Sequence, residues 1–405
     1  MKTKTLLTLM LVAVVMAASA QSNETDSYLK TVLKNLEAIQ SATYHEEGVV
    51  WTPYETAPLF IQNHYVKEFD NPVDTTIGAS FIELLANDTS RIALAYDGAA
   101  RVLVDDDKKT LEIDSFNVDR GVPFRLVSPP FYNYTKNIIR YMLTTTDSIT
   151  VEPQESDTTL HVILTIHEDR NVEFFGKAYK NPFPPMFGND PTSRYEIWID
   201  KRTNLPFKCL REMSHNKSQS TVSNPVFNKV KIDNFSVADY FPADYEIIDY
   251  KERMERQKMQ KADVMEGTVA PDFLLTGTHG NQVSLKEIQS EVVLLHFTGI
   301  GCGPCLLSIP FMEKISKEYS PQQLTVLSIE TWGNKMNTLK NYQAKHQFTY
   351  TFLQGNSDVT KAYNAMGVPR FFVLDKNHVI RKVFNGYDDK NSDNEIKKVI
   401  DALLK

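Results

Sequence analysis

Two cysteines separated by two residues constrain this chain more than any other feature. Cys302-Gly303-Pro304-Cys305 follows the apolar run 292–297 and opens a helical pattern. Unpaired backbone N–H groups at a helix N-terminus favour a thiolate, so a cysteine there has a lowered pKa and becomes nucleophilic. A second cysteine one turn further in can resolve a mixed disulfide. We therefore predict that Cys302 attacks a disulfide and that Cys305 resolves it.

The same pair would also fit half of a zinc site or a purely structural disulfide. Zinc needs two further Cys or His ligands. The chain has only 3 cysteines, and the third, Cys209, lies far away in the sequence. We therefore predict no metal site and no cofactor, and we expect Cys209 to be a small buried apolar residue.

Residues 1–20 have the pattern of a secretory signal peptide. Two lysines precede an apolar run at residues 6–18, and Ala18-Ser19-Ala20 matches a cleavage site. The run is shorter than the ~20 residues that span a bilayer, which favours cleavage over membrane anchoring. We expect an exported protein that is soluble after cleavage, located in the periplasm if the source has two membranes. That compartment is oxidising.

The 405 residues suggest two domains. After an amphipathic helix near residues 29–39, short β-branched and aromatic runs such as 91–96, 160–166 and 195–199 alternate with turn residues. Many of these runs alternate apolar and polar side chains, as half-buried antiparallel strands do. We expect residues 24–250 to form an α+β domain with a large antiparallel sheet.

A charged segment at 251–266 is the expected linker, and the pattern beyond it differs. Apolar runs alternate with helical patterns, which predicts an α/β domain over residues 267–405 with a mixed central sheet. The short connection 375–378 indicates an antiparallel hairpin. The expected strands are 292–297, 324–330, 370–374 and 379–384, and the expected helices are 302–319, 336–346, 358–365 and 394–404.

Several motifs of this second domain resemble the TlpA-like envelope branch of the thioredoxins, within the AhpC/TSA–thioredoxin superfamily. They are the segments 269–273 (VAPDF) and 280–285 (GNQVSL), the strand 292–297 and the Cys-Gly-Pro-Cys motif. The segment 367–375 is similar to the family loop whose proline is cis and faces the dithiol. The resemblance implies a thioredoxin-like fold, a cis bond before Pro369, and a Val368 backbone that binds the substrate chain. Pro310 matches the family's helix-kink proline.

The chain departs from this family in two places. The family usually has a Trp before the first cysteine, but here the run is Thr298-Gly-Ile-Gly301, so the apolar surface beside the dithiol would be reduced. His296 stands where thioredoxins have a buried acid. We hypothesise that His296 helps to deprotonate Cys305, and Glu330 is a second candidate proton acceptor. The alternatives are an ordinary core histidine and an ordinary strand-end carboxylate.

The segment 195–208 resembles the LolA-like lipoprotein carriers. That resemblance implies a half-barrel sheet that shelters an apolar cavity. Five apolar side chains would line the cavity or belong to the core: Phe174, Phe175, Phe183, Met186 and Phe187.

The predicted function is an exported thiol–disulfide oxidoreductase. The Gly-Pro pair between the cysteines resembles reducing thioredoxins, which favours a reductase of envelope proteins. An upstream membrane or envelope electron donor would supply its electrons.

The net charge of −7 gives no support for nucleic acid as a partner. One alternative is a binding protein whose first domain holds a hydrophobic ligand. A peroxidase is disfavoured, because Thr298 lies four residues before Cys302 and peroxiredoxins have a Thr at three. The substrate, the electron donor and the oligomeric state stay open.

Overall fold

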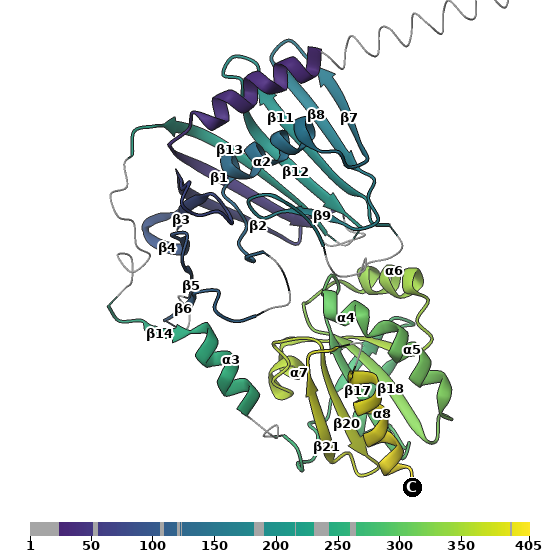
Figure 1. Ribbon diagram of the computed structural model, residues 1–405. Coiled ribbons are helices and arrows are strands. Elements are labelled where there is room, and N and C mark those ends of the chain that lie inside the picture. Colours follow the sequence, from purple (N-terminus) through teal and green to yellow (C-terminus); the bar gives the residue numbers. More distant parts are fainter. Residues whose placement is uncertain are drawn as a thin grey trace, which may run out of the picture.

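The computed structural model describes residues 24–51, 56–105, 109–119, 122, 124–181, 190–214, 216–230, 243–259, 265–388 and 391–405. The expected signal peptide lies outside these residues and stays a prediction. Two large sheets, of 12 and 7 strands, occupy different parts of the chain and lie one above the other in Figure 1. Among the described helices, none is long and apolar enough to cross a membrane.

The twelve-stranded sheet and its helices form what we call the N-terminal region. The strand order is β14-β6-β5-β4-β3-β2-β1-β13-β12-β11-β8-β7. The strands are β1 (Ser41–Trp51), β2 (Phe60–Asp70), β3 (Ala79–Leu85), β4 (Asp88–Tyr96), β5 (Arg101–Asp105), β6 (Thr110–Asp114), β7 (Ile149–Glu155), β8 (Thr159–Ile166), β11 (Ser193–Asp200), β12 (Leu205–Met213), β13 (Asn216–Phe227) and β14 (Glu246–Asp249).

One strand pair departs from the expected antiparallel pattern. β14 runs parallel to β6 at the sheet edge, whereas the other neighbouring pairs are antiparallel. A parallel pair needs a long connection instead of a tight turn, and residues 115–245 separate β6 from β14 along the chain. This region is therefore rich in sheet, as expected, but one of its edges has a different topology.

Two helices pack on this sheet, the helical residues 24–37 and α2 (Phe131–Thr144) (Figure 1). The residue before α2 is Pro130, which has no side-chain cap to offer. Instead, the buried Glu68 of β2 accepts hydrogen bonds from the N–H groups of Tyr132 at 3.1 Å and Asn133 at 2.6 Å. A carboxylate is a favourable partner for the free N–H groups at a helix start. The sheet thus caps the helix that covers it.

Two smaller elements complete this part of the chain. β9 (Val172–Phe174) and β10 (Ala178–Lys180) pair as a separate two-stranded ribbon. The helix α3 (Tyr250–Met259) follows β14 directly and occupies the first part of the expected charged linker.

The seven-stranded sheet and its helices form what we call the C-terminal region, residues 265–405. The strand order is β16-β15-β19-β18-β17-β20-β21. β17, β18 and β19 are parallel, whereas β20 and β21 form an antiparallel hairpin next to β17, which confirms the predicted mixed sheet. The strands are β15 (Leu274–Gly277), β16 (Gln282–Ser284), β17 (Val292–Thr298), β18 (Leu324–Glu330), β19 (Thr351–Gln354), β20 (Arg370–Asp375) and β21 (Ile380–Asn385).

Apolar cores cover both faces of this sheet. All seven residues of β17 are buried, as a central strand with two covered faces requires. The helical elements are η2 (Leu285–Glu287), α4 (Gly303–Leu307), α5 (Ile309–Glu318), α6 (Met336–His346), α7 (Ser357–Ala362) and α8 (Ser392–Leu403).

The predicted single helix at 302–319 is wrong in one respect, because it divides into α4 and α5 at Ser308. Pro310 has no N–H group to bond to the carbonyl of Leu306, so the regular helical ladder is interrupted there.

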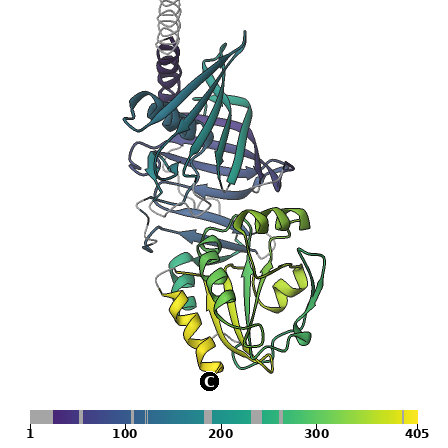
Figure 2. The same cartoon turned by 90° about the vertical axis from the view of Figure 1, so that its right-hand side faces the viewer.

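The two regions approach each other at α6. In both views this helix lies at the end of the C-terminal region that is turned toward the twelve-stranded sheet (Figure 1, Figure 2). Hydrogen bonds from Thr192 lower the pKa of Asp190, and the charge of Lys345 on α6 adds a smaller lowering. A side chain of the N-terminal region therefore lies within electrostatic reach of α6.

Candidate active site

The dithiol lies where a central strand turns into a helix. Cys302 is the N-cap residue of α4 and forms a disulfide with Cys305, with their Cα atoms 5.3 Å apart. The N–H of Cys305 donates to Cys302 Sγ at 3.3 Å. Cys302 is 6% exposed and Cys305 is 1% exposed. The outer sulfur therefore faces the helix N–H groups that would stabilise a thiolate, and the inner sulfur lies behind it.

The loop before β20 completes the surroundings of the outer sulfur. The peptide bond between Val368 and Pro369 is cis, as the family resemblance implied. Cys302 Sγ lies 3.8 Å from the carbonyl oxygen of Val368. The structure thus brings together Cys302, Cys305, Val368 and Pro369 from two segments that β17 and β20 hold side by side.

His296 lies in the middle of β17 and is 1% exposed. Its Nδ1 is 2.9 Å from Ser328 Oγ, and its Nε2 is 3.3 Å from Ser308 Oγ. Ser308 Oγ donates to the carbonyl of Cys305 at 2.7 Å. Burial lowers the pKa of His296 to about 3, so the ring is neutral at pH 7. His296 is therefore connected through the hydroxyl of Ser308 to the backbone carbonyl of Cys305.

The donor pattern fixes the tautomer of this ring. The single proton of Ser308 goes to the Cys305 carbonyl, so its oxygen accepts from Nε2–H, and Ser328 then donates to Nδ1. The His296 ring presents a proton, not a lone pair, toward the dithiol. The chain ends on the Cys305 carbonyl and not on its sulfur, so accepting a proton from the Cys305 thiol would require Ser308 to turn toward that sulfur and the ring to change its tautomer.

Glu330 ends β18 directly beside Thr298 of β17 and is fully buried. Its carboxylate accepts hydrogen bonds from the N–H of Trp332 at 3.0 Å, the N–H of Asn334 at 3.1 Å and the Asn334 amide at 2.8 Å. The N–H of Ile300 also donates to it. Burial raises the pKa of Glu330, and the N–H groups of Asn334, Trp332 and Ile300 oppose that rise. The carboxylate links the loops that follow β17 and β18.

Sequence reasoning does not single out Ser308, Ser328 or Trp332. A usable signal exists for Trp332, because it follows β18 by two residues and the carboxyl ends of adjacent parallel strands meet at one edge of a sheet. No comparable signal points to the serines, because their role depends on contact with His296 across the sheet and across α4.

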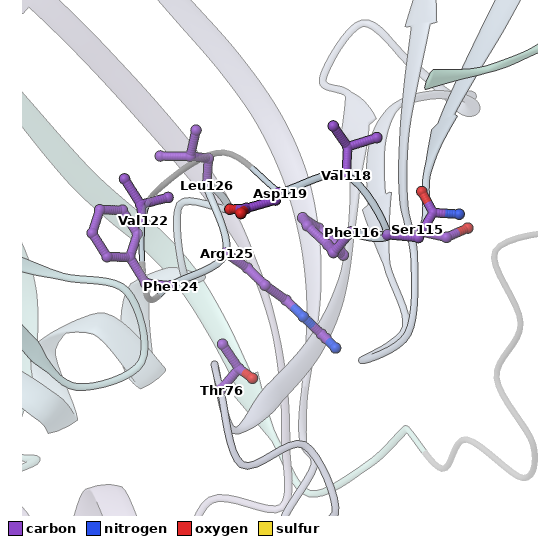
Figure 3. A pocket seen from close by; sticks show the side chains of 10 residues that line it. Thr76, Ser115, Phe116, Val118, Asp119, Val122, Phe124, Arg125 and Leu126 are labelled. Carbon is purple, nitrogen blue, oxygen red and sulfur yellow. The ribbon is translucent and has the colours of Figure 1, made fainter. Parts of the chain in front are cut away.

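The N-terminal region contains a cavity of about 530 Å³ (Figure 3). Its lining is mixed, with Phe116 and Phe124 beside Asp119 and Arg125. The guanidinium of Arg125 donates to Tyr96 Oη at 2.6 Å and lies 4.9 Å from the Phe116 ring. The walls therefore include a fixed cation as well as aromatic rings.

The apolar residues proposed for a ligand cavity separate into two groups, those that the structure describes and those that it does not. Phe174 belongs to the buried core, and the ring of Phe175 stacks on that of the lining residue Phe124, with the ring centroids 4.6 Å apart. Phe183, Met186 and Phe187 lie outside the described residues.

The third cysteine has a different environment from the dithiol. Cys209 on β12 is a free thiol and is 3% exposed. Burial raises its pKa, and the charges of Glu46 and Glu196 raise it further, which makes the thiol inert at neutral pH. Within the described part of the chain, no group of three His, Cys, Asp or Glu side chains could hold a metal ion.

Comparison with known proteins gives consistent matches over about a third of the chain. The family model described as Redoxin matches residues 265–400. The thiol-disulfide oxidoreductase ResA of Geobacillus thermodenitrificans is 28% identical over 145 residues, which is 36% of this chain and 81% of ResA. The thioredoxin-like protein YneN of Bacillus subtilis is 30% identical over 128 residues, which is 31% of this chain and 75% of YneN.

A solved structure of similar length to the C-terminal region also matches. It is a thiol:disulfide interchange protein of the thioredoxin family from Chlorobium tepidum, with 22% sequence identity and a TM-score of 0.31. The match covers 36% of this chain and 100% of that chain.

Proposed function

This chain belongs to the thioredoxin-like proteins and is a protein thiol–disulfide oxidoreductase, and from that premise we propose that it is an exported reductase of envelope proteins. The observation that carries the proposal is the Cys302–Cys305 disulfide at the start of α4, beside the carbonyl of Val368. In this proposal Cys302 is the attacking residue, Cys305 is the resolving residue, and Val368 and Pro369 bind the substrate chain.

The reaction transfers two electrons from the dithiol to the substrate. The Cys302 thiolate attacks one sulfur of a protein disulfide, forms a mixed disulfide, and releases the other substrate sulfur as a thiolate that takes up a proton. The Cys305 thiolate then attacks Cys302 Sγ, which forms the Cys302–Cys305 disulfide and releases the second substrate thiol. The disulfide in the structure corresponds to this oxidised product. A dithiol protein of the envelope must reduce it before the next cycle.

The direction and the location rest on features of the sequence. The Gly-Pro pair between the cysteines favours a reductase, and the pattern of residues 1–20 favours export. We propose the division into residues 24–250, a linker at 251–266 and residues 267–405, with a LolA-like first domain that helps to select the envelope partner. The approach of α6 to Asp190 supports such a role, because the first domain then lies near the enzyme domain.

Two groups remain proposed proton acceptors for Cys305. We favour His296, whose partner Ser308 is bonded to the Cys305 backbone carbonyl, over Glu330, whose oxygens already accept from Trp332 and Asn334. In this proposal the ring changes tautomer so that Nδ1–H donates to Ser328. The Ser308 hydroxyl then turns from the Cys305 carbonyl to its sulfur, takes up the thiol proton and passes its own proton to Nε2.

The alternative function is a binding protein that holds a hydrophobic ligand in its first domain. The mixed lining of the described cavity, with Arg125 and Asp119, does not favour an apolar ligand. Extraction of the purified protein with organic solvent tests this alternative, and a stoichiometric copurifying lipid would support it.

The decisive test of the reductase proposal uses the chain without residues 1–20. With dithiothreitol as electron donor, the wild type should reduce the disulfides of insulin. The Cys305→Ala variant should accumulate mixed disulfides with envelope proteins, while a Cys302→Ser/Cys305→Ala double variant should trap none. A wild type that oxidises reduced peptides but fails to reduce insulin would contradict the proposed direction. Absence of both activities would contradict the oxidoreductase role of the pair.

A further inference from the structure

The indole of Trp332 lies on the turn that carries the reactive cysteine. A Cβ atom built on Gly299 would meet the indole ring atoms of Trp332 at 2.5 to 2.8 Å, so the ring rests directly on the glycine backbone. The N–H of Cys302 donates to the Gly299 carbonyl at 3.1 Å, which closes the turn between these two residues. Only a residue without a side chain lets the ring approach this closely.

This indole is partly open to solvent. Trp332 is 45% exposed, although most large apolar side chains of this region are buried. A Trp side chain buries a large apolar area when a partner covers it. Its exposure beside the dithiol therefore leaves apolar surface available to an incoming chain.

The buried carboxylate of Glu330 holds Trp332 in this position. It accepts from the N–H of Trp332 and from the N–H of Ile300, which lies in the turn before Cys302. The N–H of Thr331 also donates to the carbonyl of Thr298 at 2.9 Å. The loop with the indole and the loop with the dithiol are thus tied to the same anionic group, and Glu330 is a positioning residue.

We propose that Trp332 docks the substrate polypeptide beside the dithiol, and so supplies from the loop after β18 the aromatic side chain that is absent before Cys302. The inference rests on the proposed attack by Cys302. The Val368 carbonyl lies near the same sulfur, and Met366, two residues earlier, is 74% exposed. The indole lies on the turn before Cys302 and this loop lies beside the Cys302 sulfur, so in this proposal a substrate segment that places its sulfur on Cys302 contacts both.

This arrangement selects for a particular chemical class of substrate. The partner is an extended polypeptide segment with a large apolar side chain next to its disulfide-bonded cysteine. The indole face contacts that side chain, while the disulfide exchange itself needs no contact with Trp332. A small disulfide without flanking residues reaches Cys302 equally well with or without the indole.

The test compares two substrates with the full chain that lacks residues 1–20. One is a peptide disulfide with Leu or Phe beside the cysteine, and the other is hydroxyethyl disulfide. Trp332→Ala should lower kcat/KM for the peptide by about tenfold or more, mainly through KM. It should leave kcat/KM for the small disulfide unchanged. Trp332→Phe should retain most of the kcat/KM for the peptide that Trp332→Ala loses. Leu274→Ala is the matched control, because Leu274 is 65% exposed on β15, which β19 and β18 separate from β17.

Three outcomes overturn the inference, and they are distinguishable. Equal losses on both substrates would show that Trp332 supports the turn and docks nothing. No loss on either would show that the indole is idle. A wild type that reduces neither substrate would overturn the reductase proposal, and the docking role would fall with it.

Discussion

Cys209 in the N-terminal region and Cys302 in the C-terminal region are almost equally buried, at 3% and 6% exposure. Cys209 lies in the middle of a strand, inside an apolar core, where burial and the charges of Glu46 and Glu196 raise the pKa of its thiol. Cys302 lies at a helix start and receives a hydrogen bond from the N–H of Cys305. The fraction of exposed surface therefore does not identify the reactive thiol, whereas its position relative to backbone N–H groups does.

The two regions also differ in the ionisable groups they bury. In the N-terminal region, burial raises the pKa of Glu68 to about 7 and that of Glu83 to about 8. In the C-terminal region, burial lowers the pKa of His296 to about 3. The raised pKa values of Glu68 and Glu83 lower the stability of the first region as the pH rises, whereas the lowered pKa of His296 lowers the stability of the second as the pH falls. Burial also raises the pKa of Glu330 in the second region, and this opposes the effect of His296.

The largest expected effect separates the two cysteines. Cys302→Ser should reduce the reduction of insulin to background, because the attacking sulfur is lost, while Cys209→Ser should leave the rate unchanged. In the reduced native protein, iodoacetamide should modify Cys302 rapidly near neutral pH and should reach Cys209 only after denaturation. Mass spectrometry of the alkylated peptides checks this order. Rapid alkylation of native Cys209 would contradict the comparison.

The next effect concerns the contact between Gly299 and Trp332. Gly299→Ala should displace the indole, because a Cβ there would lie 2.5 Å from the ring. We expect a loss of several-fold in kcat/KM for peptide disulfides and little change for a small disulfide. Gly333→Ala serves as a comparison at a nearby glycine of the same loop, and its positive φ makes it a control for backbone strain alone. Equal effects of both substitutions would point to general damage to the loop.

A smaller effect concerns stability and pH in the N-terminal region. Burial and the charge of Glu46 raise the pKa of Glu83 from 4.5 to about 8, so the folded state holds a proton that the unfolded state releases. The resulting stabilisation is present below pH 4.5 and is lost as the pH rises through about 8. Its upper limit is about 1.4 kcal/mol per pKa unit, and partial exposure of Glu83 reduces it. Urea unfolding followed by Trp51 and Trp198 fluorescence should show this decline, and Glu83→Gln should reduce it, with a remainder from Glu68, whose pKa burial raises to about 7.

The smallest effect concerns the opposite dependence in the C-terminal region. The folded state resists protonation of His296 between about 3 and 6.5, so stability should fall as the pH drops below 6.5. Trp332 is the only Trp beyond residue 198 and reports on this region. His296→Asn should flatten the decline, with a remainder from His346, whose pKa burial lowers to about 4.

The same variant tests proton transfer, because an unchanged pH profile for mixed-disulfide resolution would contradict a role of His296 as base.

Much of the C-terminal region follows from local sequence. The bounds of β18 and α6 coincide with the predicted 324–330 and 336–346, and the hairpin of β20 and β21 is where the short connection 375–378 indicated it. Apolar periodicity and turn residues act between chain neighbours, so a single sequence contains them. The sequence did not reveal β15, β16 and β19, because strands of three or four residues are defined by their pairing partners more than by their own pattern.

The sequence by itself determined that a strand leads into a helix through Cys302 and Cys305, since strand pattern, motif and helix pattern are contiguous. Only the tertiary structure decided what surrounds the two sulfurs. The parallel register of β17 and β18 sets Glu330 beside Thr298 and lays Trp332 on Gly299, while folding of α4 brings Ser308 to His296. These contacts join residues that are distant in the chain, and their geometry depends on strand register and helix placement, which no local pattern encodes.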